Sequence, residues 1–288
     1  MLTITLFECI QVALMATAAF VVGRQPVRRT VAAFLVFCTF VLSWFAPGNR
    51  ISRAALAGIA IGSVILTVEL AFNSKPRFLS RERLRFYPGR RSPVGSLRII
   101  GHIFVEVLIG GAACLILLQT RHPNSTAVGM LRLAAGVAMI YAVAALAFEL
   151  IRLGLWAMGM SAPLLHRTPI AARSVGEFWG QRWNLVISAW LRQYFYLPLA
   201  RRRRPGLGIM CAFLVSGALH GWPMMVAVSS AAGCTTLAFF LLQGVFVLAE
   251  QRLQIHTWPD YLARAWTLTA LLLPSPLYID PGLRLFNL

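Results

Sequence analysis

The sequence predicts an all-α, polytopic integral membrane protein of about eight transmembrane helices, with one further amphipathic helix at the membrane interface. Apolar residues make up 58% of the 288 residues and charged residues only 12%, and the mean hydropathy is +0.71. Apolar runs recur along the whole chain at lengths close to the ~20 residues that cross a hydrocarbon core. This composition excludes an ordinary soluble fold.

The expected spans follow one another through short loops. The second and the last are short for a full crossing and are expected to be tilted or partial. In chain order the spans are expected at 2–22, 31–46, 54–72, 99–119, 133–151, 206–222, 224–249 and 265–280. Because the chain has no internal repeat and no low-complexity tract, residues 1–288 are treated as a single membrane-embedded domain.

The formal net charge of +18 is explained by topology and does not indicate a nucleic-acid partner. If the amino terminus lies outside the cytoplasm, 22 of the 27 Lys and Arg residues fall in inward loops. Such a bias is the positive-inside rule, and the inward charges are suited to anionic headgroups. The basic 73–98 loop is therefore expected to bind headgroups, with guidance of an anionic substrate as the alternative. The outward residues are Arg50, Arg53, Arg121, Arg132 and Arg284.

Ionisable residues inside the expected spans are few. His102 and Glu106 are four residues apart, so a local pair is expected, with a proton relay or the start of a metal site as sharper alternatives. Glu149, three residues before Arg152, and Glu69, near Lys75, are expected to be paired structural carboxylates. The remaining loop histidines (His122, His166 and His256) are expected to be solvated. No HExxH or Cys/His spacing is present, so no metal is expected.

The chain is organised around residues 174–222, taken as the catalytic core. Its first part is expected to be an amphipathic helix at the membrane interface, because Trp and Tyr favour the headgroup level. Asn184, Ser188 and Arg192 step by four along a line beside the aromatic face. A helix that only anchors the chain is the alternative. The aromatic face consists of Trp179, Trp183, Val186, Ile187, Trp190 and Tyr194.

The last part of this region is an apolar helix that reaches a single histidine, His220. Ser216 and Gly217 precede it by four and three residues, so small residues line the face of the imidazole. An ionisable side chain at membrane depth is a functional candidate by default. A structural histidine that is hydrogen-bonded to a neighbouring helix is the alternative.

Three ordered elements resemble the signature of the membrane-bound O-acyltransferase superfamily, and the wax-synthase-like branch is the most similar. They are FWGQRWN (178–184), LRQYFYLPL (191–199) and FLVSGALH (213–220), within about 50 of the 288 residues. The resemblance implies that His220 is the catalytic histidine and Asn184 the second polar residue of the active site. This chain departs from the family pattern after the histidine, where it has Gly221 and Trp222 and many wax-synthase-like members have an acidic residue. His-Gly is similar to the branch that O-acetylates polysaccharides.

The resemblance implies an enzyme that transfers an acyl group from acyl-CoA to a hydroxyl-bearing lipid or metabolite, with acyl-CoA as co-substrate and no resident cofactor. Histidine suits the role of general base, and an asparagine amide can donate to a developing oxyanion. A fatty or lipophilic alcohol is the expected acceptor, and short-chain acetylation of a glycan or secondary metabolite is the alternative. A transporter or a non-catalytic membrane scaffold is the alternative of another class.

Other residues of the region complete the expected site. Trp179 and Trp183 are expected to form its aromatic wall, and Arg182 and Ser216 to contact substrate. The arginine block, Arg201, Arg202, Arg203 and Arg204, is expected to anchor the chain at the cytosolic surface, or to bind the phosphates of coenzyme A. The membrane would be the cytoplasmic membrane of a bacterium or the endoplasmic reticulum of a eukaryote.

Overall fold

The computed structural model describes residues 2–21, 26–72, 85–86, 93–123, 125–157, 160–161 and 166–288. These residues are almost entirely helical, as expected. Two short strands, β1 (Arg85–Phe86) and β2 (Met160–Ser161), pair antiparallel with Arg85 opposite Ser161. Most of the basic 73–98 loop lies outside the described residues, so the structure does not test its role.

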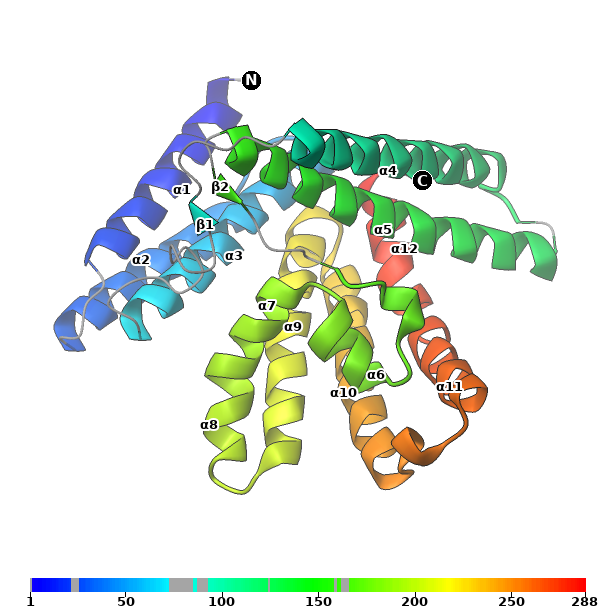
Figure 1. Cartoon of the computed structure of the whole chain (residues 1–288). Helices are drawn as coiled ribbons and strands as arrows, with labels where there is room; N and C mark the ends of the chain where they lie inside the picture. Colours follow the sequence, from blue (N-terminus) through cyan, green and yellow to red (C-terminus); the bar gives the residue numbers. More distant parts are fainter. Residues whose placement is uncertain are drawn as a thin grey trace.

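The first three helices form one group on one side of the molecule (Figure 1). They are α1 (Leu2–Val21), α2 (Pro26–Trp44) and α3 (Arg50–Phe72). The Gln11 side chain donates to the Thr39 carbonyl oxygen at 2.9 Å, and the hydroxyls of Thr39 and Ser63 are 3.1 Å apart. All three side chains are buried. In an apolar surrounding such polar contacts hold helices together, since no water can replace them.

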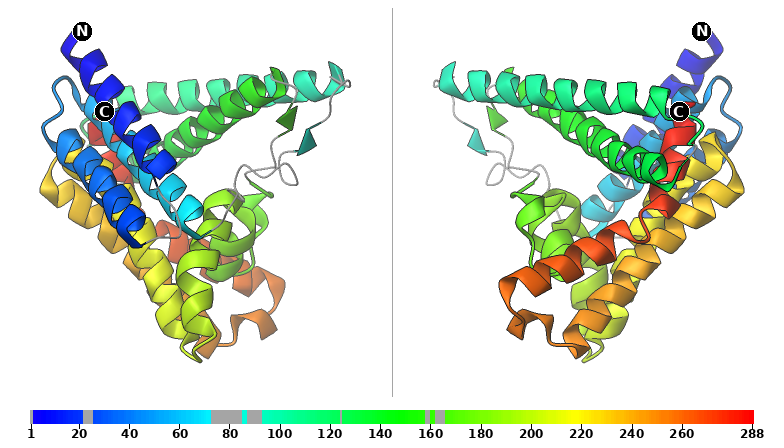
Figure 2. Two further views of the ribbon diagram at one scale, coloured as in Figure 1. Left: turned by 90° about the vertical axis from the view of Figure 1, so that its left-hand side faces the viewer. Right: turned by 90° about the vertical axis from the view of Figure 1, so that its right-hand side faces the viewer.

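Helices α4 (Pro93–Gln119) and α5 (Thr126–Ala157) form an antiparallel pair that runs across the other helices (Figures 1 and 2). The second pair, α9 (Pro205–Ala227) and α10 (Ser230–Arg252), packs closely through small residues. A Cβ at Gly221 would lie 2.8 Å from the Gly233 carbonyl oxygen. The indole N–H of Trp222 donates to the Ser43 hydroxyl at 3.1 Å, which ties α9 to α2.

The expected last span, 265–280, is wrong as a single helix. The chain instead forms two short helices, α11 (Asp260–Leu272) and α12 (Pro276–Leu285), after a short 3₁₀ turn at Ile255–Thr257. Pro274 and Pro276 stand at the break, and proline removes a backbone donor and disfavours helix in the residue before it. The break turns α12 back towards α5, where Ile279 and Leu283 are buried against Leu117 and Ala135.

Five of the described helices are long and apolar enough to cross a membrane. They run over Arg50–Glu69, Ile99–Gln119, Thr126–Gly154, Pro205–Ala227 and Ser230–Arg252, and shorter apolar helices cover Glu8–Ala18 and Thr30–Trp44. The chain is thus a multi-pass membrane protein. The expected number of eight spans is not confirmed.

The segment expected as one amphipathic helix is broken into short pieces. They are the 3₁₀ turn η1 (Pro169–Ala171), α6 (Val175–Glu177), the π-helical turn η2 (Phe178–Arg182), α7 (Leu185–Leu191), a second π-helical turn η3 (Arg192–Tyr196) and α8 (Leu197–Ala200). The main interruption is at Asn184, whose backbone is left-handed with φ 40° and ψ 59°. Trp179 and Trp183 therefore precede a turn and do not share a continuous helical face with Trp190.

Candidate functional site

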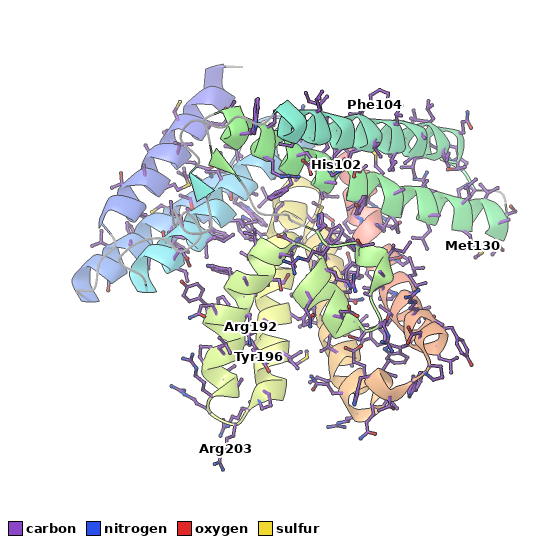
Figure 3. All side chains as sticks on the ribbon, in the orientation of Figure 1. His102, Phe104, Met130, Arg192, Tyr196 and Arg203 are labelled. Atoms are coloured by element: carbon purple, nitrogen blue, oxygen red, sulfur yellow. The ribbon has the colours of Figure 1, made fainter. Side chains whose placement is uncertain are left out.

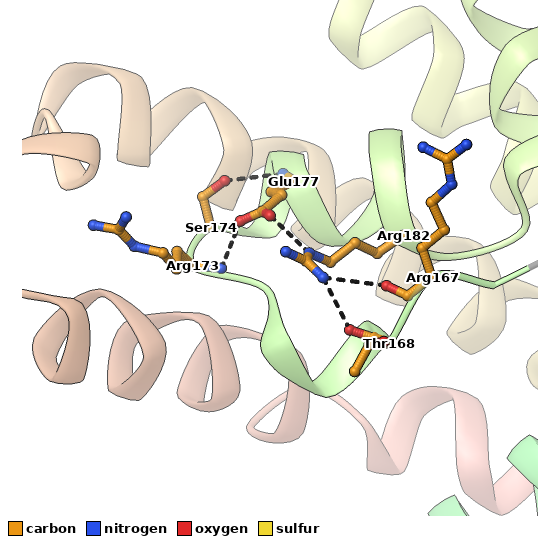
Figure 4. A network of polar contacts seen from close by, with 6 residues as sticks. All are labelled: Arg167, Thr168, Arg173, Ser174, Glu177 and Arg182. Carbon is orange, nitrogen blue, oxygen red and sulfur yellow. Dashed lines mark hydrogen bonds and ion pairs between the residues drawn. The ribbon is translucent and has the colours of Figure 1, made fainter.

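A capped turn begins the FWGQRWN segment (Figure 4). The Ser174 hydroxyl accepts from the Glu177 backbone N–H at 2.9 Å, and the Glu177 carboxylate accepts from the Arg173 N–H at 2.7 Å. This reciprocal pattern resembles a capping box, which satisfies backbone donors at the start of a helix. These hydrogen bonds fix the backbone immediately before the FWGQRWN segment.

Arg182 closes the same network (Figure 4). Its Nε donates to Glu177 at 2.7 Å, and one terminal nitrogen donates to the carbonyl oxygens of Arg167 and Thr168, each at 3.2 Å. Burial alone would raise the pKa of Glu177, but the Arg173 and Arg182 hydrogen bonds and charges outweigh it and hold this pKa below its ordinary value. Arg182 thus clamps the segment, and its contact with substrate stays a prediction.

Glu250 of α10 fixes the other side of α6. Its carboxylate accepts from the backbone N–H groups of Val175 and Gly176, each at 2.7 Å, and the side chain is buried. A Cβ at Gly176 would lie 2.8 Å from the nearer carboxylate oxygen, so only glycine allows this approach. The capped turn is therefore docked on α10 by two charge-assisted hydrogen bonds.

The turn at Asn184 is held from two directions. Its side-chain Oδ1 accepts from the Ile187 N–H at 3.3 Å, which caps α7. Its backbone N–H donates to Nδ1 of His166 at 3.2 Å. Since Oδ1 is used by the cap, the Nδ2 amino group is the end of the amide that remains to donate to a ligand.

His166 is not solvated, which corrects the expectation from the sequence. The ring is half-buried and lies against Trp183, with centroids 4.3 Å apart, and against Tyr141 at 6.1 Å. Burial lowers the pKa of His166, and the Glu149 charge opposes this shift. Because Nδ1 accepts a hydrogen bond, the neutral ring carries its proton on Nε2, which is buried without a hydrogen-bond partner among the described residues.

Trp179 reaches the centre of the fold. Its indole N–H donates to Oε1 of Gln243 on α10 at 3.1 Å, and the Gln243 amide donates to the Ala270 carbonyl oxygen at 3.0 Å. The ring packs against Phe240 with centroids 5.6 Å apart. Trp179 thus joins the FWGQRWN segment to α10 and α11.

His220 lies on α9 against α10 and α12. Its ring is 4.5 Å from that of Phe240 and 6.1 Å from that of Tyr278, between centroids. Its Nδ1 is 2.8 Å from the Ser216 carbonyl oxygen, one turn earlier. Since a carbonyl oxygen only accepts, Nδ1 carries a proton, and in the neutral ring Nε2 is therefore unprotonated.

An unbroken row of ring contacts joins the two parts of the site. Trp183 stacks on Phe178 at 5.7 Å, Phe178 meets Trp179 edge-on at 5.0 Å, and Trp179 reaches His220 through Phe240. In the described part of the chain, Asn184 and His220 are joined by neither a hydrogen bond nor a ring contact. The row of aromatic rings is what relates them.

The small residues of α9 serve helix packing. A Cβ at Gly217 would lie 2.7 Å from Leu237 and 3.0 Å from Phe240, and one at Gly208 would lie 2.9 Å from the Tyr196 carbonyl oxygen. Ser216 is buried on the same helix. Neighbouring side chains and backbone occupy the space beside these positions, so the small residues allow the close approach of adjacent segments.

The arginine block forms the turn between α8 and α9. All four side chains are exposed, and Figure 3 shows Arg203 at the outer tip of this turn, away from α4 and α5. At 1.5 Å per residue, the 15 residues from Pro205 to His220 place the turn about 22 Å from the histidine along α9. The block is therefore not part of the immediate surroundings of His220.

Glu149 of α5 pairs both with a residue of its own helix and with a residue of α4. Nδ1 of His102 lies 3.5 Å from the Glu149 carboxylate, and Arg152 donates to both Glu149 oxygens at 2.7 and 2.9 Å. The Glu149–Arg152 pair was expected, but the partner of His102 is Glu149 and not Glu106. Figure 3 shows His102 near the crossing of α4 and α5. Glu69 accepts a hydrogen bond from the Tyr194 hydroxyl; Lys75 lies outside the described residues.

Several residues at the site were missed because they lie beyond 174–222. A sequence signal exists for Gln243 and Glu250, since Thr236, Gln243 and Glu250 recur every seven residues in a largely apolar span. All three are buried in the structure. Phe240 and Tyr278 had no such signal. Among the described residues, no group of three or more His, Cys, Asp or Glu is arranged to hold a metal ion.

Comparison with known proteins finds a family match over the region that carries most of these contacts. Residues 162–242 match the model of the membrane bound O-acyl transferase family. A protein of Arabidopsis thaliana named probable long-chain-alcohol O-fatty-acyltransferase 3 is 36% identical over 106 residues, which are 34% of this chain and 30% of that protein. Probable long-chain-alcohol O-fatty-acyltransferase 7 from the same plant is 30% identical over 119 residues, which are 37% of this chain and 35% of that protein.

A second group of relatives consists of proteins that are named as O-acetylating enzymes of glycans. The peptidoglycan O-acetyltransferase of Helicobacter pylori is 30% identical over 118 residues, and a probable alginate O-acetylase of Pseudomonas fluorescens is 28% identical over 111. Each alignment covers 37% of this chain and 20% of the relative. The chain thus aligns with about a third or less of each of these proteins.

Proposed function

The chain belongs to the membrane-bound O-acyltransferase superfamily through residues 162–242, and on this premise we propose that it joins the acyl group of acyl-CoA to the hydroxyl group of a lipophilic alcohol. The observation that carries this proposal is the 2.8 Å contact between Nδ1 of His220 and the Ser216 carbonyl oxygen. It leaves Nε2 as a base beside Phe240 and Tyr278.

In the proposed reaction His220 moves one proton. Its Nε2 removes the proton of the acceptor hydroxyl as the oxygen attacks the thioester carbonyl carbon. The tetrahedral intermediate then collapses, the carbon–sulfur bond breaks, and the imidazolium returns the proton to the thiolate. The products are an ester and free coenzyme A. A base of this kind contributes ~10²–10⁴ in rate.

Asn184 supplies a donor for the acyl carbonyl in this proposal. Support comes from its cap, because the contact between Oδ1 and the Ile187 N–H orients the amide and leaves Nδ2 to donate. Trp179 and Trp183 belong to the aromatic row between Asn184 and His220 and would form the wall along which the acyl group lies. Such a wall excludes water, which would otherwise hydrolyse the thioester.

The arginine block is proposed to act at the donor end or at the lipid surface. Coenzyme A carries its phosphates far from its thioester, and the block is about 22 Å from His220 along α9. Arginine binds phosphate by paired hydrogen bonds, whether the phosphate is on the donor or on a lipid headgroup. The block faces the cytosol in the proposed orientation, with the amino terminus on the other side.

A long acyl chain is proposed over acetate. The two plant relatives, 36% and 30% identical, are named for the transfer of a fatty acyl group, whereas the two glycan O-acetylating relatives are 30% and 28% identical. The Gly221–Trp222 ending favours the acetyl alternative in sequence. In the structure Trp222 is taken up by Ser43, Phe40 and Trp44 of α2, which supports a structural reason for its identity.

The test is competition between acetyl-CoA and palmitoyl-CoA in purified protein, with fatty alcohols as acceptors. Palmitoyl-CoA is expected to have the higher kcat/KM, and His220→Ala is expected to lose at least ~10² in turnover. His256→Ala is the matched control, because His256 is exposed in the turn before α11. A higher kcat/KM for acetyl-CoA would favour the acetyl alternative, and near-normal turnover in folded His220→Ala would remove the residue from the mechanism.

A further inference from the structure

Tyr278 on α12 is a polar residue beside His220 that the proposed function does not use. Its ring meets the His220 ring at 66° with centroids 6.1 Å apart, stacks on Phe239 at 5.3 Å, and meets Phe240 edge-on at 5.8 Å. Phe239 and Phe240 are both buried. The phenol is thus held in place by the same aromatic rings that surround the histidine.

The helix that carries Tyr278 is fixed on α5. Its next residue, Ile279, fits against Gly136, where a Cβ would lie 2.5 Å from the isoleucine side chain. Gly282 receives Ile140 in the same way, since a Cβ there would lie 2.6 Å from that side chain. With Ile279 and Leu283 also buried, α12 has little freedom to shift. Groups that stabilise a transition state need such a rigid support.

The hydroxyl is the part of Tyr278 that packing does not explain. A phenylalanine could make each of these ring contacts equally well. Within the described residues the hydroxyl has no hydrogen-bond partner, although the Tyr194 hydroxyl in the same protein donates to Glu69. Tyrosine hydroxyls in apolar surroundings usually find a partner, so one that lacks a protein partner beside a candidate base is suited to a ligand.

We propose that Tyr278 is a catalytic residue whose hydroxyl donates a hydrogen bond to the oxyanion that forms when the acceptor oxygen attacks the thioester carbonyl. The inference rests on the proposed function and adds a donor on α12 to the Asn184 amide. A phenol is protonated near neutral pH and can donate a hydrogen bond without giving up its proton. When the carbon–sulfur bond breaks, the oxyanion becomes the ester carbonyl and the phenol is unchanged.

The chemistry requires the contact to strengthen as charge develops. A donor of this kind lowers the barrier of the reaction more than it tightens substrate binding. Removing the hydroxyl should therefore lower kcat while leaving both KM values nearly unchanged. Hydroxyl groups that merely position the alcohol would instead raise the KM of the acceptor.

The experiment compares Tyr278→Phe with Tyr261→Phe in purified full-length protein. Tyr261 is 71% exposed on α11, which makes it a matched control for the loss of one phenolic hydroxyl. With palmitoyl-CoA and a fatty alcohol, Tyr278→Phe is expected to lose about 10²-fold in kcat, as for other single oxyanion donors, with each KM within about twofold and an unchanged Tm. Tyr261→Phe is expected to match the wild type.

The outcomes separate this inference from the proposed function. If the wild type turns over and Tyr278→Phe keeps its kcat, the inference is wrong and the proposed function stands. A raised acceptor KM with unchanged kcat also overturns it, because the hydroxyl would then position the alcohol. If the wild type shows no acyl transfer with either donor, the proposed function fails and this inference fails with it.

Discussion

The backbone N–H of Asn184 donates a hydrogen bond to Nδ1 of His166, with 3.2 Å between the two nitrogen atoms. His166 thereby supports a left-handed residue that the sequence indicates as part of the site. The same imidazole packs against Trp183, the residue before the turn, with the two rings tilted by 33°. A loop histidine thus positions the FWGQRWN segment without belonging to it.

Replacing His166 should therefore affect turnover through Asn184. His166→Phe keeps the ring packing but removes the acceptor, which is worth roughly 1 kcal/mol and corresponds to a fivefold to tenfold loss. His166→Asn offers a side-chain oxygen near the position of Nδ1 and should recover part of the activity. The measurement is kcat with palmitoyl-CoA for both variants. Equal losses in the two would mean that the hydrogen bond does not matter.

Acid should weaken the same contact. The pKa of His166 is lowered in the folded protein, chiefly by burial, so the unfolded chain binds the extra proton first. Stability is then complete above the ordinary value of about 6.5 and is lost as the pH falls below it. The Tm of the wild type is expected to fall between about pH 7.5 and about pH 5.5, and His166→Asn should flatten this dependence. An equally steep fall in the variant would place the titrating group elsewhere.

Two substitutions at Asn184 separate its backbone from its amide. Asn184→Gly adopts φ 40° without strain and loses little capping energy. Asn184→Ala loses the cap and strains the left-handed backbone, which together cost about 2 kcal/mol. The free energy of unfolding should therefore be lower for Asn184→Ala than for Asn184→Gly. Both variants lack the Nδ2 hydrogen-bond donor. In both, kcat should therefore fall by a larger factor than the affinity for acyl-CoA. Full activity in a stable Asn184→Gly protein would leave only the turn as the reason for asparagine.

Substitutions at Glu250 and Gly176 should have non-additive effects, because both disturb the same hydrogen bonds. Glu250→Gln replaces one accepting oxygen by a donor facing a backbone N–H, and should cost about 1.5–3 kcal/mol of stability. Gly176→Ala places a Cβ 2.8 Å from the Glu250 carboxylate and should disturb the same hydrogen bonds. The double variant is expected to cost clearly less than the two single costs combined. Additive losses of Tm and turnover would show that the residues act independently.

The arginine block offers a test of how the donor binds. Replacing residues 201–204 with glutamine is expected to raise the KM for acyl-CoA if these residues bind its phosphates, with kcat nearly unchanged. Replacing them with lysine keeps the charge but loses the paired geometry, so an intermediate KM would favour phosphate binding over simple charge. An unchanged KM in the glutamine variant would leave only the surface anchor. Orientation is checked by protease accessibility in vesicles.

Local features of the site could be read from the sequence only in part. The aromatic residues of FWGQRWN and the apolar run to His220 indicate where the site lies, because helical spacing and apolar length are local properties. The break at Asn184 was not foreseen, since asparagine tolerates a left-handed backbone but does not require it. The sequence also places the partner of His102 on its own helix, whereas the structure pairs it with Glu149 of α5. A contact between helices has no local signal.

The sequence by itself determined the helical membrane class, the multi-pass character and the region around Asn184 and His220. Its composition and the order of its apolar runs are enough for that, because lipid demands that backbone groups be satisfied within each span. Only the tertiary structure decided which side chains meet. Gln243, Glu250 and Tyr278 reach the site from α10 and α12, and His166 reaches it from the loop before α6. Glycines such as Gly136 and Gly176 let neighbouring groups approach α12 and Glu250. Such close packing arises between segments far apart in the chain, so no single stretch of sequence contains it.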